Sequence, residues 1–214
     1  MQKKVNSNIN QILPLRIEVC GGIASGKTTF AKLISQIKIN PILEAFRINP
    51  FRQAWYSTPA KYGFETEISF MLQHYHQIKK EQVPHKINVC DFSFILDIAY
   101  AEIGLRSSQL DAFMTVYKEV KKELLHPSLL IYLDCNAETE MNRIRRRKRD
   151  VEKTITLKFL DFLNQAVKNQ AKKASRYLDV ITINSAEKDF VDNESIKQEI
   201  INLIKARKVL GLDI

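Results

Sequence analysis

The chain has 214 residues, 45% of them hydrophobic, and a formal net charge of +9. This length fits one domain in which helices cover both faces of a sheet. No apolar run approaches the roughly 20 residues that a membrane-spanning helix needs, and the polar segment 1–14 lacks the apolar core of a signal peptide. We therefore expect a cytoplasmic protein with no membrane partner, a flexible tail over 1–14 and a single domain over 15–214.

Short apolar runs alternate with longer helical patterns, which is typical of a parallel α/β sheet. The predicted strands cover 16–20, 41–44, 86–91, 129–135 and 179–184. The predicted helices cover 27–37, 50–57, 60–82, 94–104, 108–125, 137–148, 155–175 and 187–208. No internal repeat or linker-like tract interrupts the alternation, so one domain is the simplest interpretation.

The segment after the first predicted strand matches the phosphate-binding pattern G-x-x-x-x-G-K-T. It comprises Gly21, Gly22, Ile23, Ala24, Ser25, Gly26, Lys27, Thr28 and Thr29. Strand, glycine-rich loop and helix follow in the order that this motif requires. The glycines let the backbone curl so that its N–H groups converge on an anion, and the helix N-terminus adds partial positive charge. The motif predicts ATP binding, with Lys27 on the terminal phosphates and the Thr28 hydroxyl on Mg²⁺.

Acidic residues end several predicted strands. Glu44 ends the second and Asp91 the third. Because ligands of open α/β sheets lie beyond the carboxyl ends of the strands, we expect both carboxylates to face the phosphate loop. One would accept a proton from an attacking hydroxyl, and the other would hold magnesium or a bound water. Asp134 follows another apolar strand and competes with Asp91 as the acid on the metal side; the sequence leaves this choice open.

The segment 143–149 reads Arg-Ile-Arg-Arg-Arg-Lys-Arg. Arg143 and Arg147 share a helix face, and Arg149 follows at the helix end. Arginine suits bidentate phosphate contacts, so we expect a mobile lid over about 143–154 that closes on ATP. A nucleic-acid-binding ATPase is the alternative, but it would need cations spread along a groove with interleaved aromatics. No aromatic lies in this segment, and we expect no nucleic-acid partner.

The three cysteines, Cys20, Cys90 and Cys135, fall within or at the ends of apolar runs. An odd count without paired spacing argues against a disulfide or zinc framework. We expect all three to be small core residues.

Together these motifs resemble those of the deoxynucleoside kinase family, which contains deoxycytidine, deoxyguanosine and deoxyadenosine kinases. The similarity runs from about residue 16 to residue 190. Its elements are the phosphate loop, the segment 44–51 followed by Trp55 and Tyr56, the helical pattern 64–78, the segment 91–93 with the later Asp97, and the arginines of 143–149 with Glu152. The resemblance implies an α/β P-loop kinase fold: a three-layer sandwich with a five-stranded parallel sheet in the order 2-3-1-4-5 and an arginine-rich lid.

The resemblance also implies roles for individual residues. Glu44 would be the catalytic base that deprotonates the 5′-hydroxyl of a nucleoside, and Tyr56 and Glu152 would hold its 3′-hydroxyl. Asp91 would support magnesium and the phosphates, while Lys27, Arg143, Arg147 and Arg149 would neutralise charge during in-line transfer of the ATP γ-phosphoryl group. The family further implies a homodimer packed through the helices near 60–82 and 108–125.

The departures from the family pattern concentrate in the nucleoside half of the site. This chain has Glu67 where the family usually has glutamine, Phe92 and His74 where it often has arginine, and Ala45 in place of proline. We expect Glu67, His74, Phe92 and Asp97 to contact the nucleoside, together with Tyr56 and Glu152.

An ionised Glu67 only accepts hydrogen bonds, and guanine presents adjacent N–H groups, so a purine such as deoxyguanosine is the expected acceptor. A kinase of another small hydroxyl acceptor and a nucleotide-binding regulatory subunit are the alternatives. The intact Lys27, Thr28 and Glu44 argue against the regulatory subunit.

Overall fold

The computed structural model describes residues 15–207 and 210–211, so the expected tail over 1–14 lies outside the described residues. Its centre is a parallel sheet in the order β2-β3-β1-β4-β5, which confirms the predicted fold class. The strands are β1 (Arg16–Gly21), β2 (Asn40–Ile42), β3 (Asn88–Cys90), β4 (Leu129–Asp134) and β5 (Val180–Asn184). In the central strand Ile17 pairs with Val89 of β3 and Leu129 of β4.

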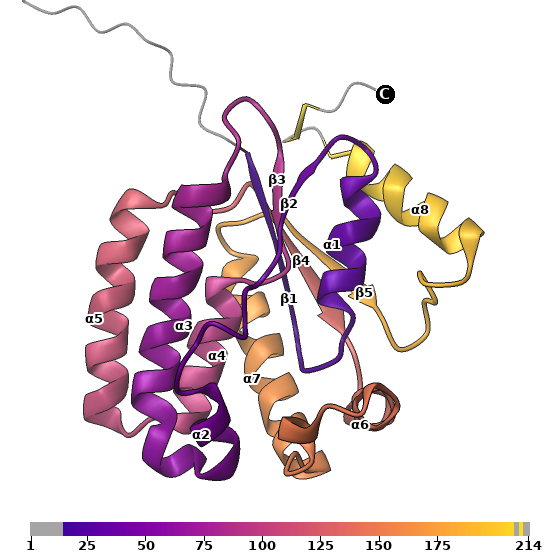
Figure 1. Ribbon diagram of the computed structural model, residues 1–214. Helices are drawn as coiled ribbons and strands as arrows, with labels where there is room; N and C mark the ends of the chain where they lie inside the picture. Colours follow the sequence, from indigo (N-terminus) through magenta and orange to yellow (C-terminus); the bar gives the residue numbers. More distant parts are fainter. Residues whose placement is uncertain (1–14, 208–209, 212–214) are drawn as a thin grey trace, which may run out of the picture.

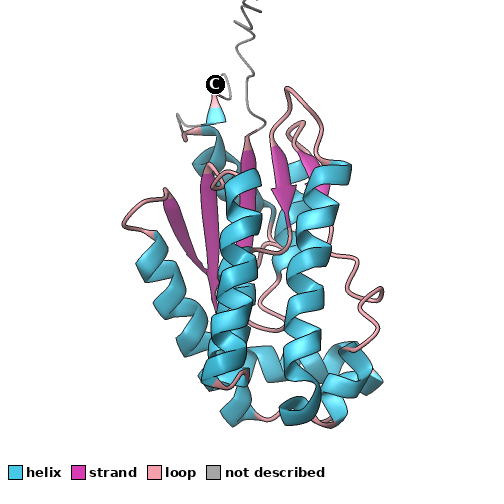
Figure 2. Ribbon diagram, turned by 90° about the vertical axis from the view of Figure 1, so that its left-hand side faces the viewer, coloured by secondary structure: helices cyan, strands magenta, loops and turns pink. Residues whose placement is uncertain are grey.

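Helices cover both faces of the sheet (Figure 1). One layer contains α1 (Lys27–Ser35) and α8 (Glu194–Lys205); the other contains α3 (Pro59–Glu81), α4 (Phe94–Gly104), α5 (Ser107–Glu123) and α7 (Leu157–Ala174). Figure 2 looks onto the second layer, whose long helices run along the strands. Three short elements, α2 (Arg52–Ser57), α6 (Ala137–Arg147) and the 3₁₀ turn Asp150–Glu152, lie at the end of the sheet where the strands finish.

The apolar runs of the strands form the core on both faces of the sheet. Ile17 of β1 packs in one cluster with Phe30 of α1 and Ile200 of α8. On the other face Leu130 of β4 packs in a cluster with Leu163 of α7. Burial on both faces explains why these strands are continuously hydrophobic, and each fully buried side chain of this size contributes about 1.5–3 kcal/mol. All three cysteines are buried and free, as expected.

The predicted last helix, 187–208, is wrong over its first turns. The side chain of Asn184 accepts the N–H groups of the backbone two and three residues on, at 3.1 and 3.3 Å. Asp189 does the same at 2.9 and 3.1 Å. Such local bonds compete with helix formation, so α8 begins only after Asn193, whose side chain caps it. The segment 186–192 is therefore a loop, and it borders the site described below.

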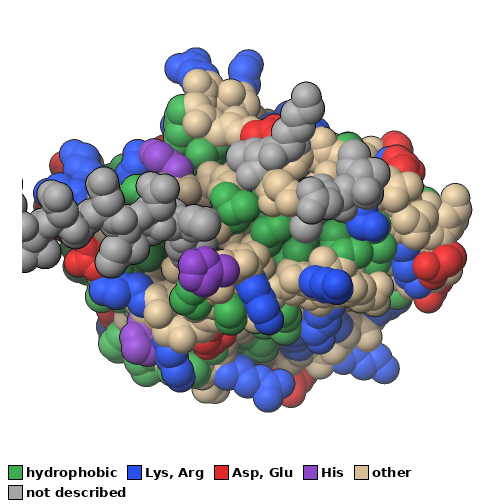
Figure 3. Space-filling model, turned by 90° about the horizontal axis from the view of Figure 1, so that it is seen from above, with side chains coloured by type: hydrophobic (Ala, Val, Ile, Leu, Met, Phe, Trp, Pro, Cys, Tyr) green, Lys and Arg blue, Asp and Glu red, His purple; other side chains and the backbone are tan. Residues whose placement is uncertain are grey.

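Seen from above, the end of the molecule where the strands begin carries Lys and Arg side chains scattered among hydrophobic and other side chains (Figure 3). Among the described residues, every helix is too short or too polar to cross a membrane.

Candidate active site

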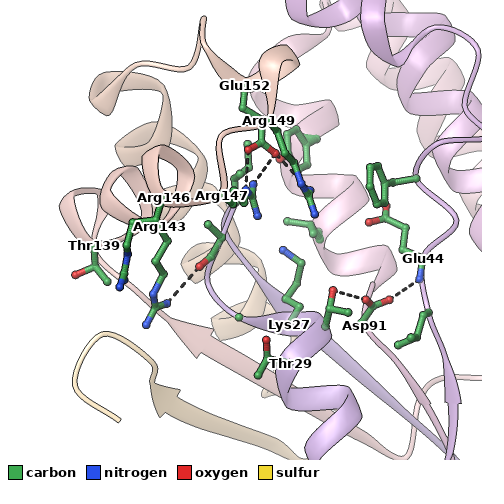
Figure 4. Close-up of a pocket in the computed structure, with 18 of the residues that line it drawn as sticks. Lys27, Thr29, Glu44, Asp91, Thr139, Arg143, Arg146, Arg147, Arg149 and Glu152 are labelled. Atoms are coloured by element: carbon green, nitrogen blue, oxygen red, sulfur yellow. Dashed lines mark hydrogen bonds and ion pairs between the residues drawn. The ribbon is translucent and has the colours of Figure 1, made fainter. Parts of the chain in front are cut away.

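A cavity of ≈ 890 Å³ lies at the carboxyl ends of the strands. Its walls come from the loop after β1, the segment after β2, and helices α2, α3, α4 and α6. Among the residues that line it are Lys27, Thr28, Thr29, Glu44, Tyr56, Glu67, His74, Asp91, Asp97, Arg143, Arg147, Arg149 and Glu152. The structure thus brings nearly all of the predicted site residues to one place. Figure 4 shows Lys27 between the arginines and Glu152 on one side and Glu44 and Asp91 on the other.

The phosphate loop is curled by backbone in the left-handed region. Ala24 has φ 65° and Gly26 has φ 104°, and a Cβ at Gly26 would lie 3.0 Å from the Phe190 ring. Lys27 folds back over the loop, where its Nζ donates to the carbonyls of Gly21 at 3.0 Å and Gly22 at 2.8 Å. Burial lowers the pKa of Lys27, although nearby carboxylates oppose this shift. The loop therefore presents converging N–H groups and a poised cation, which fits a polyphosphate.

Thr28 and Asp91 form the pair that fits a magnesium ion. The Thr28 hydroxyl donates to Oδ2 of Asp91 at 2.6 Å, and Oδ1 accepts the backbone N–H of Glu44 at 2.5 Å. Burial raises the pKa of Asp91, against the effect of these two hydrogen bonds. A hydroxyl and a carboxylate are oxygen ligands of the kind Mg²⁺ takes beside substrate phosphates. Asp134 instead accepts the Tyr132 hydroxyl at 2.9 Å and lies outside the cavity lining, so the geometry favours Asp91.

The segment that carries Glu44 is a loop, because β2 ends at Ile42 and the predicted strand through residue 44 is too long. Two glutamines of α3 tie it down. Gln77 accepts the N–H of Ala45 at 3.1 Å and donates to the Leu43 carbonyl at 3.0 Å, and Gln73 donates to the Ala45 carbonyl at 2.9 Å. Neither glutamine was predicted as a site residue from the sequence. Their spacing of four residues, which places them on one helix face, was the available signal.

His74 bridges two acids. Its Nε2 lies 3.1 Å from Oε1 of Glu44, and its Nδ1 lies 2.9 Å from Oδ2 of Asp97. Burial alone would lower the pKa of His74, but the two carboxylates outweigh it and raise the pKa to about 10. Burial would likewise raise the pKa of Glu44, yet the contact with His74 holds it below its usual value. The site therefore contains an imidazolium between two carboxylates at neutral pH.

Phe92 corrects one sequence-based expectation. It is 1% exposed and does not line the cavity, so it cannot contact a nucleoside there. Its ring stacks against His74 with centroids 4.2 Å apart and an angle of 10° between the planes. The residue in the usual arginine position thus fixes the orientation of the imidazolium from behind.

The position of Glu67 also differs from what the sequence led us to expect. It lines the cavity beside Phe70 and Tyr100 but is only 4% exposed. Burial raises the pKa of Glu67 well above its usual range, and the negative charge of Asp97 adds to the shift. Burial therefore favours the neutral carboxyl over the ionised form expected from the sequence. A neutral carboxyl offers one O–H donor and one carbonyl acceptor, the same pair of functions that glutamine offers.

The arginines of the predicted lid face the cavity but are engaged with protein groups. Arg147 forms a bidentate pair with Glu152 at 2.7 and 2.6 Å, and Arg149 lies 3.5 Å from the same carboxylate. Glu152, expected at the sugar 3′-hydroxyl, thus holds two lid arginines in place. Burial and the charge of Glu152 raise the pKa of Tyr56 to about 12, so its phenol remains a donor.

Arg143 holds the phosphate loop. Its NH1 donates to the carbonyls of Ala24 at 3.2 Å and Ser25 at 3.3 Å, and its NH2 donates to the carbonyl of Ser185 at 2.6 Å. The expected contact of Arg143 with phosphate would have to share these donors. Its position connects α6 to the loop from the side opposite Lys27 (Figure 4).

Several cavity residues were given no individual role from the sequence. Arg52 of α2 lies over the ring of Phe46 at 5.0 Å, as does Arg149 from the lid. Phe46 thereby links the Glu44 loop to the lid through cation–π contacts. Tyr100 packs edge-on against Trp55, with centroids 6.0 Å apart. Tyr100 lies in a strongly apolar helix, where sequence offers no signal that one aromatic faces a cavity.

Comparison with known proteins places this geometry in context. A family model described as "Deoxynucleoside kinase" matches residues 17–209. The chain is 30% identical over 190 residues to a deoxyadenosine kinase of Dictyostelium discoideum, which covers 86% of this chain and 77% of that protein. It is 29% identical over 199 residues to a deoxyguanosine kinase of Bacillus subtilis (strain 168), covering 88% and 95%.

A solved structure of deoxyadenosine kinase from M. mycoides with bound dCTP has a TM-score of 0.76 at 19% identity. The match covers 90% of this chain and 100% of that one. At this identity the likeness shows the fold alone.

Proposed function

The chain belongs to the deoxynucleoside kinase family, and from that premise we propose that it transfers the γ-phosphoryl group of ATP to the 5′-hydroxyl of a purine deoxynucleoside. Deoxynucleoside kinases are phosphotransferases that use ATP. The observation that carries the proposal is the single cavity that joins the Glu44 carboxylate, the Thr28–Asp91 pair and the phosphate loop. The product would be the 5′-monophosphate.

In this proposal Glu44 is the base. Its backbone is held by Asp91 and its carboxylate by His74, so one oxygen can accept the proton of a hydroxyl placed in the cavity. Lys27 and the loop N–H groups would bind and orient the phosphates, and Arg147 and Arg149 would neutralise charge from the lid. Magnesium, when bound at Thr28 and Asp91, would supply further charge neutralisation. Positioning and electrostatics carry most of the rate in phosphoryl transfer.

Turnover with a nucleoside panel tests the proposal. Purified protein with ATP and Mg²⁺ is expected to convert deoxyguanosine and deoxyadenosine to their 5′-monophosphates, measured by chromatography of the products. A preference for thymidine would contradict the purine assignment. Absence of product from every nucleoside would contradict the 5′-kinase proposal and favour another hydroxyl acceptor or a regulatory subunit.

The purine assignment is supported by the two relatives, which are named as a deoxyadenosine and a deoxyguanosine kinase, and Glu67 is compatible with both of these bases. A neutral Glu67 can donate to a ring acceptor and accept from an adjacent N–H. Adenine offers a ring nitrogen beside its amino group, and guanine offers its carbonyl oxygen beside a ring N–H. Deoxyguanosine therefore remains an acceptor, and the protonated side chain extends the proposal to deoxyadenosine.

Substitution Glu67→Gln tests the protonation state directly. Because glutamine reproduces the donor and acceptor of a neutral carboxyl, we expect the ratio of kcat/KM for deoxyguanosine and deoxyadenosine to change by less than about threefold. An ionised Glu67 would predict a selective loss for deoxyguanosine by about tenfold or more, since a good hydrogen-bond pair contributes about 1–3 kcal/mol to base discrimination. Glu65→Gln, on the same helix but outside the cavity lining, is the matched control.

Substitution His74→Phe removes the cation between Glu44 and Asp97. Burial then raises the pKa of Glu44 against only the smaller effects of Lys27 and Arg52, so the base is protonated over a wider pH range. In the wild type Glu44 is ionised above its depressed pKa; in the variant the acidic limb of the kcat–pH profile is expected to move upward. We expect turnover at pH 7 to fall by about 10- to 100-fold.

The exposed His76, two residues along α3, provides the control substitution His76→Phe. An acidic limb unchanged in His74→Phe would show that the imidazolium does not set the protonation of the base.

We also propose that the protein works in the cytoplasm as a homodimer that packs through α3 and α5. The expectation comes from the family, and light scattering of the purified protein tests the oligomeric state. The basic segment supports nucleotide phosphates as its partner, because Arg143, Arg147 and Arg149 all line the cavity.

A further inference from the structure

A carboxylate is buried directly beneath the phosphate loop. Glu140 of α6 is 0% exposed, and the sequence analysis assigned it no role. A Cβ at Gly22 would overlap the carboxylate of Glu140 and the side-chain amide of Asn164. Glycine at this position is therefore required by the close approach of an acid and an amide to the loop backbone.

The hydrogen bonds of Glu140 leave one oxygen unpaired. Asn164 of α7 donates from Nδ2 to Oε2 of Glu140 at 2.9 Å and to the carbonyl of Cys135 at 3.1 Å. Oε1 of Glu140 has no hydrogen-bond partner among the described residues. An ionised carboxylate in this state is costly, because burial removes water that protein groups only partly replace.

Charged groups face Glu140 from two elements. Lys27 stands at the start of α1, and Arg143 and Arg147 lie on α6 itself; all three favour the anion. The other titratable groups around it are the thiol of Cys135 and the phenols of Tyr100 and Tyr132, which are neutral at physiological pH. Burial outweighs the cations and Asn164 and raises the pKa of Glu140 from 4.5 to about 7.

Lys27 is the group through which this charge reaches the ligand. Its Nζ is bonded to the carbonyl of Gly22, the same residue that Glu140 contacts from below. Arg143, one helical turn after Glu140, holds the carbonyls of Ala24 and Ser25. Helix α6 therefore contacts the phosphate loop through two side chains. Arg143 holds the loop carbonyls, and Glu140 lies close enough to Lys27 for their charges to interact.

We propose that Glu140 is a positioning residue of the phosphate loop, and that gain or loss of its proton tightens or weakens the hold of the loop on the triphosphate of the donor. As a neutral acid, Glu140 leaves the charge of Lys27 to the phosphates. As an anion, it competes for Lys27 and repels the phosphates. This inference rests on the proposed use of ATP but not on the identity of the acceptor.

The sign of the pH effect follows from linkage. A bound triphosphate adds negative charge near Glu140 and raises its pKa further, so binding takes up a proton near neutral pH. ATP affinity is therefore expected to fall as pH rises through about 7. Between two charges several ångströms apart in a protein interior, the effect on Kd is about tenfold.

The experiment measures binding of ATP with excess Mg²⁺, without acceptor, by calorimetry between pH 6 and pH 8.5. Wild type is compared with Glu140→Gln, which keeps the shape but not the charge, and with Glu138→Gln, which removes an exposed acid from the same helix. Titration of ATP itself is common to all three proteins. Wild type and Glu138→Gln are expected to lose about tenfold more affinity over this range than Glu140→Gln. Calorimetry in two buffers of different protonation enthalpy is expected to show more proton uptake in the two proteins that keep Glu140 than in Glu140→Gln.

Equal pH dependence in wild type and Glu140→Gln would overturn the inference. If that variant does not fold, ¹³C NMR of the Glu140 carboxyl in the wild type decides: a midpoint near 7 supports the inference, and one near the ordinary 4.5 overturns it. Failure of ATP to bind the wild type at every pH would instead contradict the proposed function itself.

Discussion

Glu44→Gln is expected to lower turnover by about 10²- to 10⁴-fold while leaving ATP binding intact. Glutamine has the size of glutamate, and its carbonyl can still accept a hydrogen bond from His74. It cannot accept the proton of a hydroxyl, so the variant loses the base and little else. The backbone contact with Asp91 does not involve the side chain and is expected to remain.

The measurement pairs kcat for the preferred deoxynucleoside with the Kd for ATP and Mg²⁺ from calorimetry. Glu65→Gln, which changes a charge on α3 away from the cavity, is the control. If Glu44→Gln kept more than about a tenth of wild-type turnover, another group would have to take the proton. The pH profile adds a second check. Because His74, Lys27 and Arg52 together outweigh burial and depress the pKa of Glu44, the wild type is expected to stay active down to mildly acidic pH.

The sequence predicts those parts of the site that depend on contiguous residues or on where neighbouring strands end. The phosphate loop needs only contiguous residues. Glu44 and Asp91 were placed correctly because parallel strands end at one edge of a sheet, so residues that follow neighbouring strands must meet. An error of two residues in the end of β2 did not matter, since the loop still carries Glu44 to that edge.

The rest depends on packing between helices that no local pattern encodes. His74 reads as an ordinary helix histidine until α3 packs beside α4 and brings it to Asp97. The raised pKa of Glu67 follows from its burial, which the sequence pattern of α3 does not reveal. Glu140 likewise looks like one more acid in a charged helix, and only the approach of α6 to the loop gives it a partner.

Lys27→Met is expected to separate ligand binding from folding. In the ligand-free protein two effects of this substitution oppose each other. Burial lowers the pKa of Lys27, so removing the charge relieves a cost of desolvation. The carbonyls of Gly21 and Gly22 lose their donor, which costs about 1 kcal/mol for each bond. We therefore expect the melting temperature without ligand to change by only a few degrees.

We expect Lys27→Met to lose the increase in melting temperature that ATP binding produces in the wild type. For the wild type, ligand at about 100 times its Kd adds about 2.7 kcal/mol of stability, which for a chain of this size raises the melting temperature by about 5–10 °C. Methionine cannot hold the terminal phosphates, so the variant is expected to show little of this shift and to lose turnover by about 10³-fold. Lys32→Met, on the exposed face of α1, controls for loss of charge from that helix. A full thermal shift in Lys27→Met would mean that the lysine remains on its two carbonyls when ATP binds, and that the curled backbone alone holds the phosphates.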